Sequence, residues 1–281
     1  MTSEGGRKPM PRPMLEPRKG ARRISEVPSE VLGALNRGET ATVNLVEWLA
    51  LDQRAMVRHV LPAVGLKSAV TGAVAACDEE QKPSAMQLLK AIGRHLAGEI
   101  ELKATPRSPF GKLLWHPSDV VRSWACFAVT YADGLTLARR IDALEPLAAD
   151  PHFGVRETAW MALRPAVEAE LEPAIGLLED WALHVDANLR RCASEVTRPC
   201  GVWCAHLTRL KAEPQIAQPI LEPLKSDGSK YVRDSVGNWL NDASKSRPAW
   251  VRKLARRWQK ESQTPETAYI VKKALRTINA T

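Results

Sequence analysis

The sequence predicts an all-α protein built as a solenoid of helix pairs. Three observations predict this class. Apolar residues recur at helical spacing from Ile24 onward, no convincing series of alternating β-branched strands occurs, and one short pattern repeats at intervals of 34, 34 and 43 residues. A period of about 34–45 residues with two helices per unit is typical of α-helical solenoids. The composition, 44% hydrophobic and 26% charged over 281 residues, suits a folded chain without a membrane-spanning run.

The first helices are marked by residues that start or stop a helix. Ser29 precedes a short amphipathic run that ends at Gly38, and we expect Ser29 to cap it. A longer run covers residues 40–65 and is interrupted at Pro62. A further amphipathic run covers residues 82–100. We therefore expect helices throughout the N-terminal half of the chain.

The internal repeat gives a register for the helices that follow. Each copy has Asp or His, then five residues, then an arginine: Arg122, Arg156, Arg190 and Arg233. The residues one before and three after each arginine are apolar and one helical turn apart, so we expect them in the core. An Asp followed by Val-Arg before the second helix resembles HEAT repeats. Residues that can cap or turn the chain there are Ser118, Asp150, Asp186 and Asp227.

A second face of these helices carries polar residues. It comprises the positions one, five and eight after each arginine, and in HEAT-like solenoids we expect it to line the concave side. The alternative is an ordinary solvated face, which a Trp beside a Glu fits less well. Trp160 lies at the edge of this face, whereas Trp124 and Trp239 lie off it and are expected in the core. The face consists of Glu157, Met161, Arg164, Arg191, Glu195, Arg198, Asp234, Asn238 and Asn241.

The charge is concentrated at the two ends of the chain. Residues 1–23 hold seven Lys or Arg and two Glu, and residues 245–281 hold ten Lys or Arg and two Glu, while residues 24–244 carry a net charge of −5. Basic ends around a folded body favour a polyanionic partner, with nucleic acid first. The alternative is that the basic ends only keep the protein in solution. We expect a disordered basic arm over 1–23, a repeat domain over 24–258 and a basic helical segment over 259–281.

The five cysteines do not form a convincing site. Cys200, Cys204 and His206 have metal-ligand character, but one short cluster leaves a four-ligand zinc site incomplete. An odd number of cysteines and a basic start without an apolar signal segment favour a reduced, cytoplasmic protein with free thiols. We therefore expect no metal and no other cofactor.

The repeat segments resemble the AlkC/AlkD superfamily of DNA alkylation repair glycosylases, and the AlkC-like branch in particular. The resemblance covers residues 24–50, 150–165 and 189–199, and it is strongest over 229–251, with its V-R-x-S-V-x-N-x-L-N-D core. It implies a HEAT-like solenoid curved around DNA. It also implies base-excision repair of cationic N-alkylated bases such as 3-methyladenine, without flipping the base into a deep pocket. We expect a monomer acting on duplex DNA at the bacterial nucleoid.

The resemblance directs attention to carboxylates and Trp on the polar face. A cationic base leaves without protonation, so a carboxylate that stabilises an oxocarbenium-like sugar and an aromatic surface for the cation are sufficient. We favour Glu157 as the catalytic carboxylate, with Glu195 second and Trp160 against the lesion nucleotide. The alternatives are that Glu157 pairs with Arg191 or Arg164, that Glu195 pairs with Arg198 or Arg233, and that Trp160 is core.

The expected DNA contacts come from the same helices. Helix starts offer N–H groups to phosphates, and cations add charge. The repeat arginines have the alternative role of bracing neighbouring repeats. A rival hypothesis from another class is a non-catalytic HEAT-like module that binds DNA structure or a protein. The residues that we expect to contact the DNA backbone are Arg164, Arg191, Arg198, Lys230, Arg233, Asn238 and Lys245.

Overall fold

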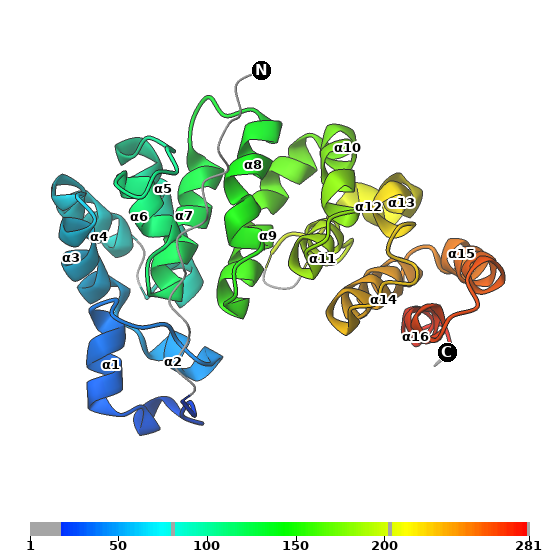
Figure 1. The fold of residues 1–281 in the computed structure, drawn as a ribbon, viewed down its shortest axis with the longest axis horizontal. Coiled ribbons are helices and arrows are strands. Elements are labelled where there is room, and N and C mark those ends of the chain that lie inside the picture. The colour runs from blue at the N-terminus through cyan, green and yellow to red at the C-terminus, as the bar shows by residue number, and fades with distance from the viewer. Residues whose placement is uncertain (1–17, 80–81, 202–203, 280–281) are drawn as a thin grey trace, which may run out of the picture. The chain divides into compact units, whose positions relative to one another are not determined.

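The computed structural model describes residues 18–79, 82–201 and 204–279. Within these residues the chain forms sixteen α-helices and three short 3₁₀ helices, and no strand (Figure 1). The predicted all-α class is therefore confirmed. The helices form two compact units, one ending at Gly134 and one beginning at Leu135, and this division falls inside the repeat domain expected over 24–258.

The first unit contains seven α-helices. Its predicted runs are helical, but the run over 40–65 is two helices rather than one, because Asn44 and Asp52 each accept backbone N–H groups and start a separate helix. The expected cap at Ser29 is wrong: Ser29 is the first helical residue, and Pro28 before it makes no side-chain cap. The helices are α1 (Ser29–Asn36), α2 (Leu45–Ala50), α3 (Gln53–Ala63), α4 (Val70–Asp78), α5 (Ala85–Glu99), α6 (Pro109–Leu114) and α7 (Asp119–Tyr131), with 3₁₀ turns η1 (Ile24–Glu26) and η2 (Lys67–Ala69).

The segment before Ile24 contacts the first unit. Arg18 forms an ion pair with Glu47, whose side chain is 1% exposed, and donates to the carbonyl of Ala41 at 3.0 Å. Asn44 donates to the carbonyl of Ala21. A buried carboxylate needs a cation, which explains why this part of the expected basic arm is bound. Residues 1–17 of the arm lie outside the described residues.

The second unit stacks its helices in two layers. Helices α9, α11, α14 and α16 pack side by side in one layer, and α8, α10, α13 and α15 accompany them (Figure 1). The basic segment expected over 259–281 contains the end of α15 and α16, which packs against α14. The elements are α8 (Leu137–Ala148), α9 (Phe153–Ala169), α10 (Leu171–Ala182), α11 (Ala187–Val196), α12 (Thr208–Ala212), η3 (Pro214–Ala217), α13 (Gln218–Leu221), α14 (Lys230–Ser244), α15 (Pro248–Glu261) and α16 (Pro265–Ala274).

The predicted core register is confirmed. The apolar residues flanking the repeat arginines are at most 1% exposed, namely Val121, Ala125, Val155, Ala159, Leu189, Ala193, Val232 and Val236. Trp124 and Trp239 are also fully buried, as expected. Burial of all eight side chains at equivalent positions shows that the repeat is a packing unit and not only a sequence pattern.

Each repeat arginine closes the turn before its own helix. Its Nη1 donates to the carbonyls six and five residues earlier in all four copies, at 2.6–2.9 Å. The Asp or His six residues before the arginine accepts the backbone N–H two residues later. This accounts for the conserved spacing within the chain. Ser118, by contrast, makes no side-chain cap.

Two of these arginines also contact a later repeat, which is the bracing role considered above for the repeat arginines. Arg190 forms a two-pronged ion pair with Asp227, at 2.6 and 3.1 Å, and Arg156 donates to the hydroxyl of Tyr231 at 3.3 Å. One guanidinium can close the turn before its own helix and also contact a later repeat, because it has five N–H groups in a fixed fork.

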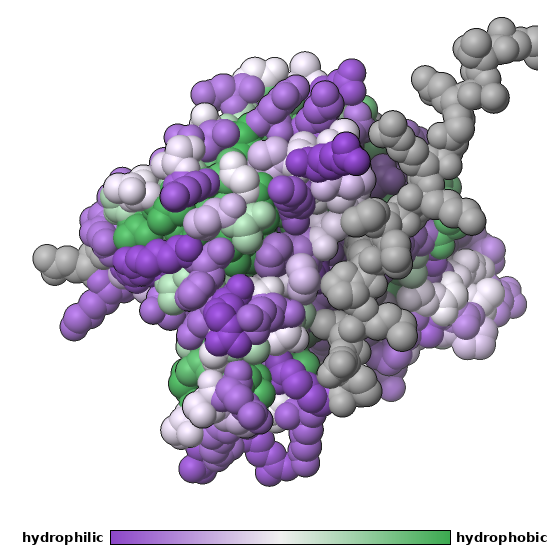
Figure 2. Space-filling view, turned by 60° about the vertical axis from the view of Figure 1, so that its left-hand side comes forward, coloured by the Kyte–Doolittle hydropathy of each residue, from purple (hydrophilic) through white to green (hydrophobic). Residues whose placement is uncertain are grey.

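The surface is mainly hydrophilic on the face that Figure 2 shows, where hydrophobic residues are visible in patches between polar ones. Among the described residues no helix is both long and apolar enough to cross a bilayer.

Candidate functional site

The site begins with two side chains of α9 that touch each other. Glu157 and Trp160 are three residues apart, which places them on one side of the helix. The indole Nε1–H of Trp160 donates to Glu157 Oε2 at 2.8 Å. The Glu157 side chain is 35% exposed, whereas Trp160 is only 5% exposed. Trp160 therefore offers its N–H to the carboxylate and keeps most of its ring in the protein.

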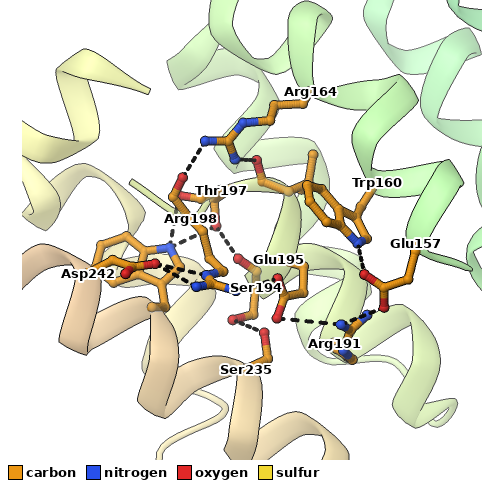
Figure 3. A network of polar contacts seen from close by, with 12 residues as sticks. Glu157, Trp160, Arg164, Arg191, Ser194, Glu195, Thr197, Arg198, Ser235 and Asp242 are labelled. Carbon is orange, nitrogen blue, oxygen red and sulfur yellow. Dashed lines mark hydrogen bonds and ion pairs between the residues drawn. The ribbon is translucent and has the colours of Figure 1, made fainter. Parts of the chain in front are cut away.

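Arg191 of α11 connects the two candidate carboxylates. Its Nη2 lies 2.7 Å from Glu157 Oε1 and 3.6 Å from Glu195 Oε1 (Figure 3). The guanidinium also lies over the ring of Tyr231, 4.2 Å from the centroid. Burial alone lowers the pKa of Arg191, but the carboxylates of Glu157 and Glu195 raise it above its ordinary value. Arg191 is thus held as a cation between the two acids.

The charges continue in alternation toward α14. Glu195 Oε2 lies 3.1 Å from Arg198, and Arg198 Nη2 lies 2.7 Å from Asp242 Oδ2. Asp242 Oδ1 in turn lies 3.0 Å from Lys245 Nζ. Although burial opposes it, Glu195 and Asp242 raise the pKa of Arg198. The polar network, defined as Glu157, Arg191, Glu195, Arg198, Asp242 and Lys245, contains three acids and three bases and is neutral in sum. Figure 3 shows its members from Glu157 to Asp242.

Neutral side chains hold the helices that carry this network. Ser235 of α14 donates to Ser194 of α11 at 2.9 Å, and Trp239 Nε1 donates to the Thr197 carbonyl at 2.9 Å. These bonds join α11 to α14 directly beside Glu195 and Arg198. The spacing between acids and bases is therefore fixed by the helix interface.

Arg164 holds the C-terminal end of α11 and the residues that follow it. It is 2% exposed and donates to the carbonyls of Val196, Arg198 and Ala205, at 3.0, 2.6 and 2.9 Å. The carbonyls at the C-terminal end of a helix have no helical partner, and a buried guanidinium satisfies them here. Burial lowers the pKa of Arg164.

The expectation of an open polar face is wrong at three positions. Arg164, Glu195 and Asn241 are 2%, 4% and 1% exposed. The physical reason is that α9, α11, α14 and α16 pack closely, so residues between two helices are covered. Asn241, for example, donates to Thr277 at 2.8 Å, at the contact with the end of the chain.

The remaining predicted DNA contacts lie nearer the surface. Lys230 is exposed and pairs with Asp234 at 2.7 Å, and Lys245 is half exposed beside Asp242. Arg233 closes its turn, and Asn238 is partly buried on α14. Tyr231 and Asp242 also belong to the site, and the sequence did not predict either of them. Both stand in the segment 229–251 that carries the resemblance, but nothing local indicates which partner each meets.

The cysteine-rich insert adds no metal centre in the described residues. No group of three or more His, Cys, Asp or Glu with metal-binding geometry lies among residues 18–79, 82–201 and 204–279. His206 Nδ1 lies 3.5 Å from Lys211 Nζ. None of the five cysteines forms a disulfide, and burial raises the pKa of the Cys192 thiol to about 12, which makes it a poor nucleophile.

Comparison with solved structures identifies the fold. The Pseudomonas fluorescens alkylpurine DNA glycosylase AlkC, bound to DNA containing an abasic site analog, superposes with a TM-score of 0.63 and 26% identity, covering 80% of this chain and 61% of that chain. The chain has an AlkC-like fold. This confirms, for the fold, the resemblance that the sequence indicates. A second structure, smu.31 from Streptococcus mutans UA159, has a TM-score of 0.50 and 22% identity, covering 80% of this chain and 98% of that chain.

Sequence comparison adds one relative. The uncharacterized protein YhaZ of Bacillus subtilis (strain 168) is 40% identical over 134 residues, which are 48% of this chain and 37% of YhaZ. No family model matches the chain. The AlkC-like chain thus spans less than two thirds of both YhaZ and AlkC.

Proposed function

We propose that this protein is a DNA glycosylase that removes cationic N-alkylated bases, such as 3-methyladenine, from duplex DNA. The observation that carries the proposal is the carboxylate of Glu157, which is partly exposed and has both oxygens held in place in an AlkC-like fold. A fixed carboxylate is suited to stabilise positive charge that develops in a transition state. The bound DNA of the AlkC structure supports DNA as the partner.

The reaction requires little from the protein because the leaving group is already charged. The C1′–N bond breaks and its electron pair neutralises the alkylated base. The deoxyribose then carries the positive charge as an oxocarbenium-like species. In the proposal, Glu157 stabilises this charge and positions a water molecule whose oxygen bonds to C1′. The proton of that water passes through the carboxylate to solvent, which leaves an abasic site and a neutral base.

Arg191 and Trp160 are proposed to set the position of Glu157. Each fixes one carboxylate oxygen, so that little reorganisation is needed as charge develops. Glu195 is the weaker candidate because it is 4% exposed and lies between Arg191 and Arg198. Trp160 is 5% exposed, so any contact with the lesion uses only a small part of the indole.

Of the predicted backbone contacts, the more exposed Lys230 and Lys245 are the better supported. Both lie on or directly after α14, the helix that also supplies Asp242 to the polar network. We propose a monomer bound to duplex DNA, in which Arg198 acts through Glu195 and Asp242. Arg164 is proposed to act only as a support for the end of α11.

The test is release of methylated bases from N-methylated genomic DNA, resolved by base. Wild-type protein is compared with Glu157→Gln, Glu195→Gln and the matched control Glu172→Gln, an exposed acid of α10 paired with Arg209. We expect release of 3-methylated bases by wild type and the control, and about 100-fold slower release by Glu157→Gln. Duplex affinity of Glu157→Gln is expected within about twofold of wild type.

Two other outcomes would contradict the role of Glu157 or the glycosylase proposal itself. Release by Glu157→Gln at the wild-type rate, together with loss in a folded Glu195→Gln, transfers the carboxylate role to Glu195. No release by any form, with duplex binding retained, contradicts the glycosylase proposal and favours a non-catalytic DNA-binding module.

A further inference from the structure

Helix α15 presents a row of cations on the surface of the second unit. One side of this helix is buried: Val251, Leu254, Ala255 and Trp258 are at most 4% exposed. The opposite side carries Arg252, Lys253, Arg256 and Lys260, all of them exposed. α15 is therefore an amphipathic helix whose apolar side is used for packing and whose outer side is basic.

These four cations make no ion pair within the part of the chain that the structure describes. In the described part of the chain, no acidic side chain pairs with Arg252, Lys253, Arg256 or Lys260, whereas Arg257 beside them pairs with Glu222 and Glu261. This distinguishes them from the network cations Arg191, Arg198 and Lys245, each of which has an acidic partner. Unpaired cations are the ones available to an external anion.

The spacing of the cations follows the helix. Arg252, Arg256 and Lys260 are four residues apart, so they form one ridge with about 6 Å of rise between neighbours and about 12 Å in all. A DNA strand carries a phosphate for about every 3.4 Å of helix axis. Because the phosphates also wind around this axis, neighbours on one strand are farther apart than 3.4 Å, and a ridge of three cations over about 12 Å can reach about three of them.

A groove runs beside this ridge. It has a volume of about 800 Å³ and is lined by Trp250, Gln218 of α13 and the cations of α15. Trp250 is partly exposed, and its ring centroid lies 6.2 Å from that of the buried Trp239. A rigid aromatic side chain next to cations offers a flat surface to a sugar or base beside the bound phosphates.

We propose that this basic face of α15 is a second DNA-backbone contact, separate from the polar network around Glu157. The proposal rests on the proposed function in taking DNA as the partner, but it requires no lesion and no turnover. α15 belongs to the layer opposite α14 and α16, so the strand it holds lies apart from the one at Glu157 (Figure 1). The contact adds affinity that depends on salt and not on sequence.

The chemistry favours nucleic acid over a lipid surface. A helix that lies on a membrane inserts an exposed apolar side into the lipid, and the apolar side of α15 is already buried in the protein. Residues 245–281 carry ten Lys or Arg against two acids, while residues 24–244 have a net charge of −5. The positive potential is thus concentrated in the region of α15, where a polyanion is attracted.

The experiment measures binding of an undamaged fluorescent 21-base-pair duplex between 50 and 200 mM KCl. The full chain is compared with the triple variant R252Q/R256Q/K260Q. A control triple, R58Q/K67Q/R107Q, removes the same charge from exposed positions of the first unit. We expect the slope of log affinity against log salt to become shallower by about 2–3 in the α15 triple, with at least tenfold weaker binding at 50 mM KCl. The control is expected to keep the wild-type slope.

Three results overturn the proposal: an unchanged slope in the α15 triple, an equal change in both triples, or no duplex binding by the wild type. Vesicles of phosphatidylcholine with 30% phosphatidylserine form the other arm. Vesicle binding lost in the α15 triple while its DNA slope is unchanged assigns the face to a membrane instead. The failures are distinguishable. If the wild type releases bases but the α15 triple keeps the wild-type salt slope, only the α15 proposal is contradicted. If the α15 triple has a shallower slope but the wild type releases no base, only the glycosylase proposal is contradicted.

Discussion

The indole N–H of Trp160 donates to Glu157 Oε2 at 2.8 Å, while Arg191 lies 2.7 Å from the other oxygen of the same carboxylate. One donor comes from the same helix and the other from a helix 34 residues further along the chain. The carboxylate is therefore oriented by both local and tertiary contacts while remaining 35% exposed.

Replacing Trp160 with Phe tests the hydrogen bond separately from the ring. The variant keeps an aromatic side chain in the same place but removes the only N–H of the indole. We expect base release to fall about tenfold and the free energy of unfolding to fall by about 1.5 kcal/mol, because one hydrogen bond to a partly exposed charged group is lost. Single-turnover release and urea denaturation measure the two effects. Unchanged release would show that the N–H does not position Glu157.

Arg191→Met tests the charge balance of the polar network. Glu195, 4% exposed, would keep only Arg198 as a counter-ion, and Glu157 would lose its ion pair. We expect a loss of about 3 kcal/mol of unfolding free energy, because removing one partner of a buried pair leaves charge uncompensated. Arg191→Lys should restore part of it. The matched control is Arg209→Met, which breaks an exposed pair with Glu172 and should cost less than about 1 kcal/mol. Equal losses in the two Met variants contradict the prediction.

Arg164→Met tests the hydrogen bonds that hold the C-terminal end of α11. The carbonyls of Val196, Arg198 and Ala205 would each lose a donor in a region where Arg164 is 2% exposed. We expect a loss of about 3 kcal/mol, from unsatisfied buried polar groups. Urea denaturation measures it. Limited proteolysis should also show faster cleavage between α11 and α12 than in wild type. A variant as stable as wild type would mean that water replaces the guanidinium.

His116 should make stability depend on pH. Burial, and secondarily the charge of Arg122, lower the pKa of His116 to about 4, and its Nδ1 accepts the N–H of Ser118 at 3.2 Å. The unfolded chain, with a histidine pKa near 6.5, binds more protons than the folded one between about pH 4 and 6.5. The contribution of His116 is therefore present above about pH 6.5 and is lost as the pH falls toward 4, by about 3 kcal/mol.

His116→Asn is the matched control for this pH dependence. Its amide oxygen can accept the same N–H but does not titrate. Urea denaturation of both proteins at pH 4.5, 5.5 and 7 should give a difference in unfolding free energy that changes with pH. Parallel stability curves for the two proteins would contradict the assignment.

The repeat by itself determined the helix-pair class and the core register. The arginine, the Asp or His six residues before it and the apolar residues around it interact within one turn and one helix. Local spacing therefore predicts them, and Val121, Val155, Leu189 and Val232 are buried as expected. The core positions of Trp124 and Trp239 follow from the same register.

Only the tertiary structure decided which polar residues remain accessible. Glu157 and Glu195 occupy related repeat positions, yet one is 35% exposed and the other is covered, because α11 is flanked by α9 and α14. The pairing of Arg198 with Asp242 joins residues 44 apart, and no local pattern encodes it. Sequence periodicity determines which side of a helix is apolar. The distance to the next helix, set by packing of the whole unit, decides whether a charge on the other side meets solvent or a partner.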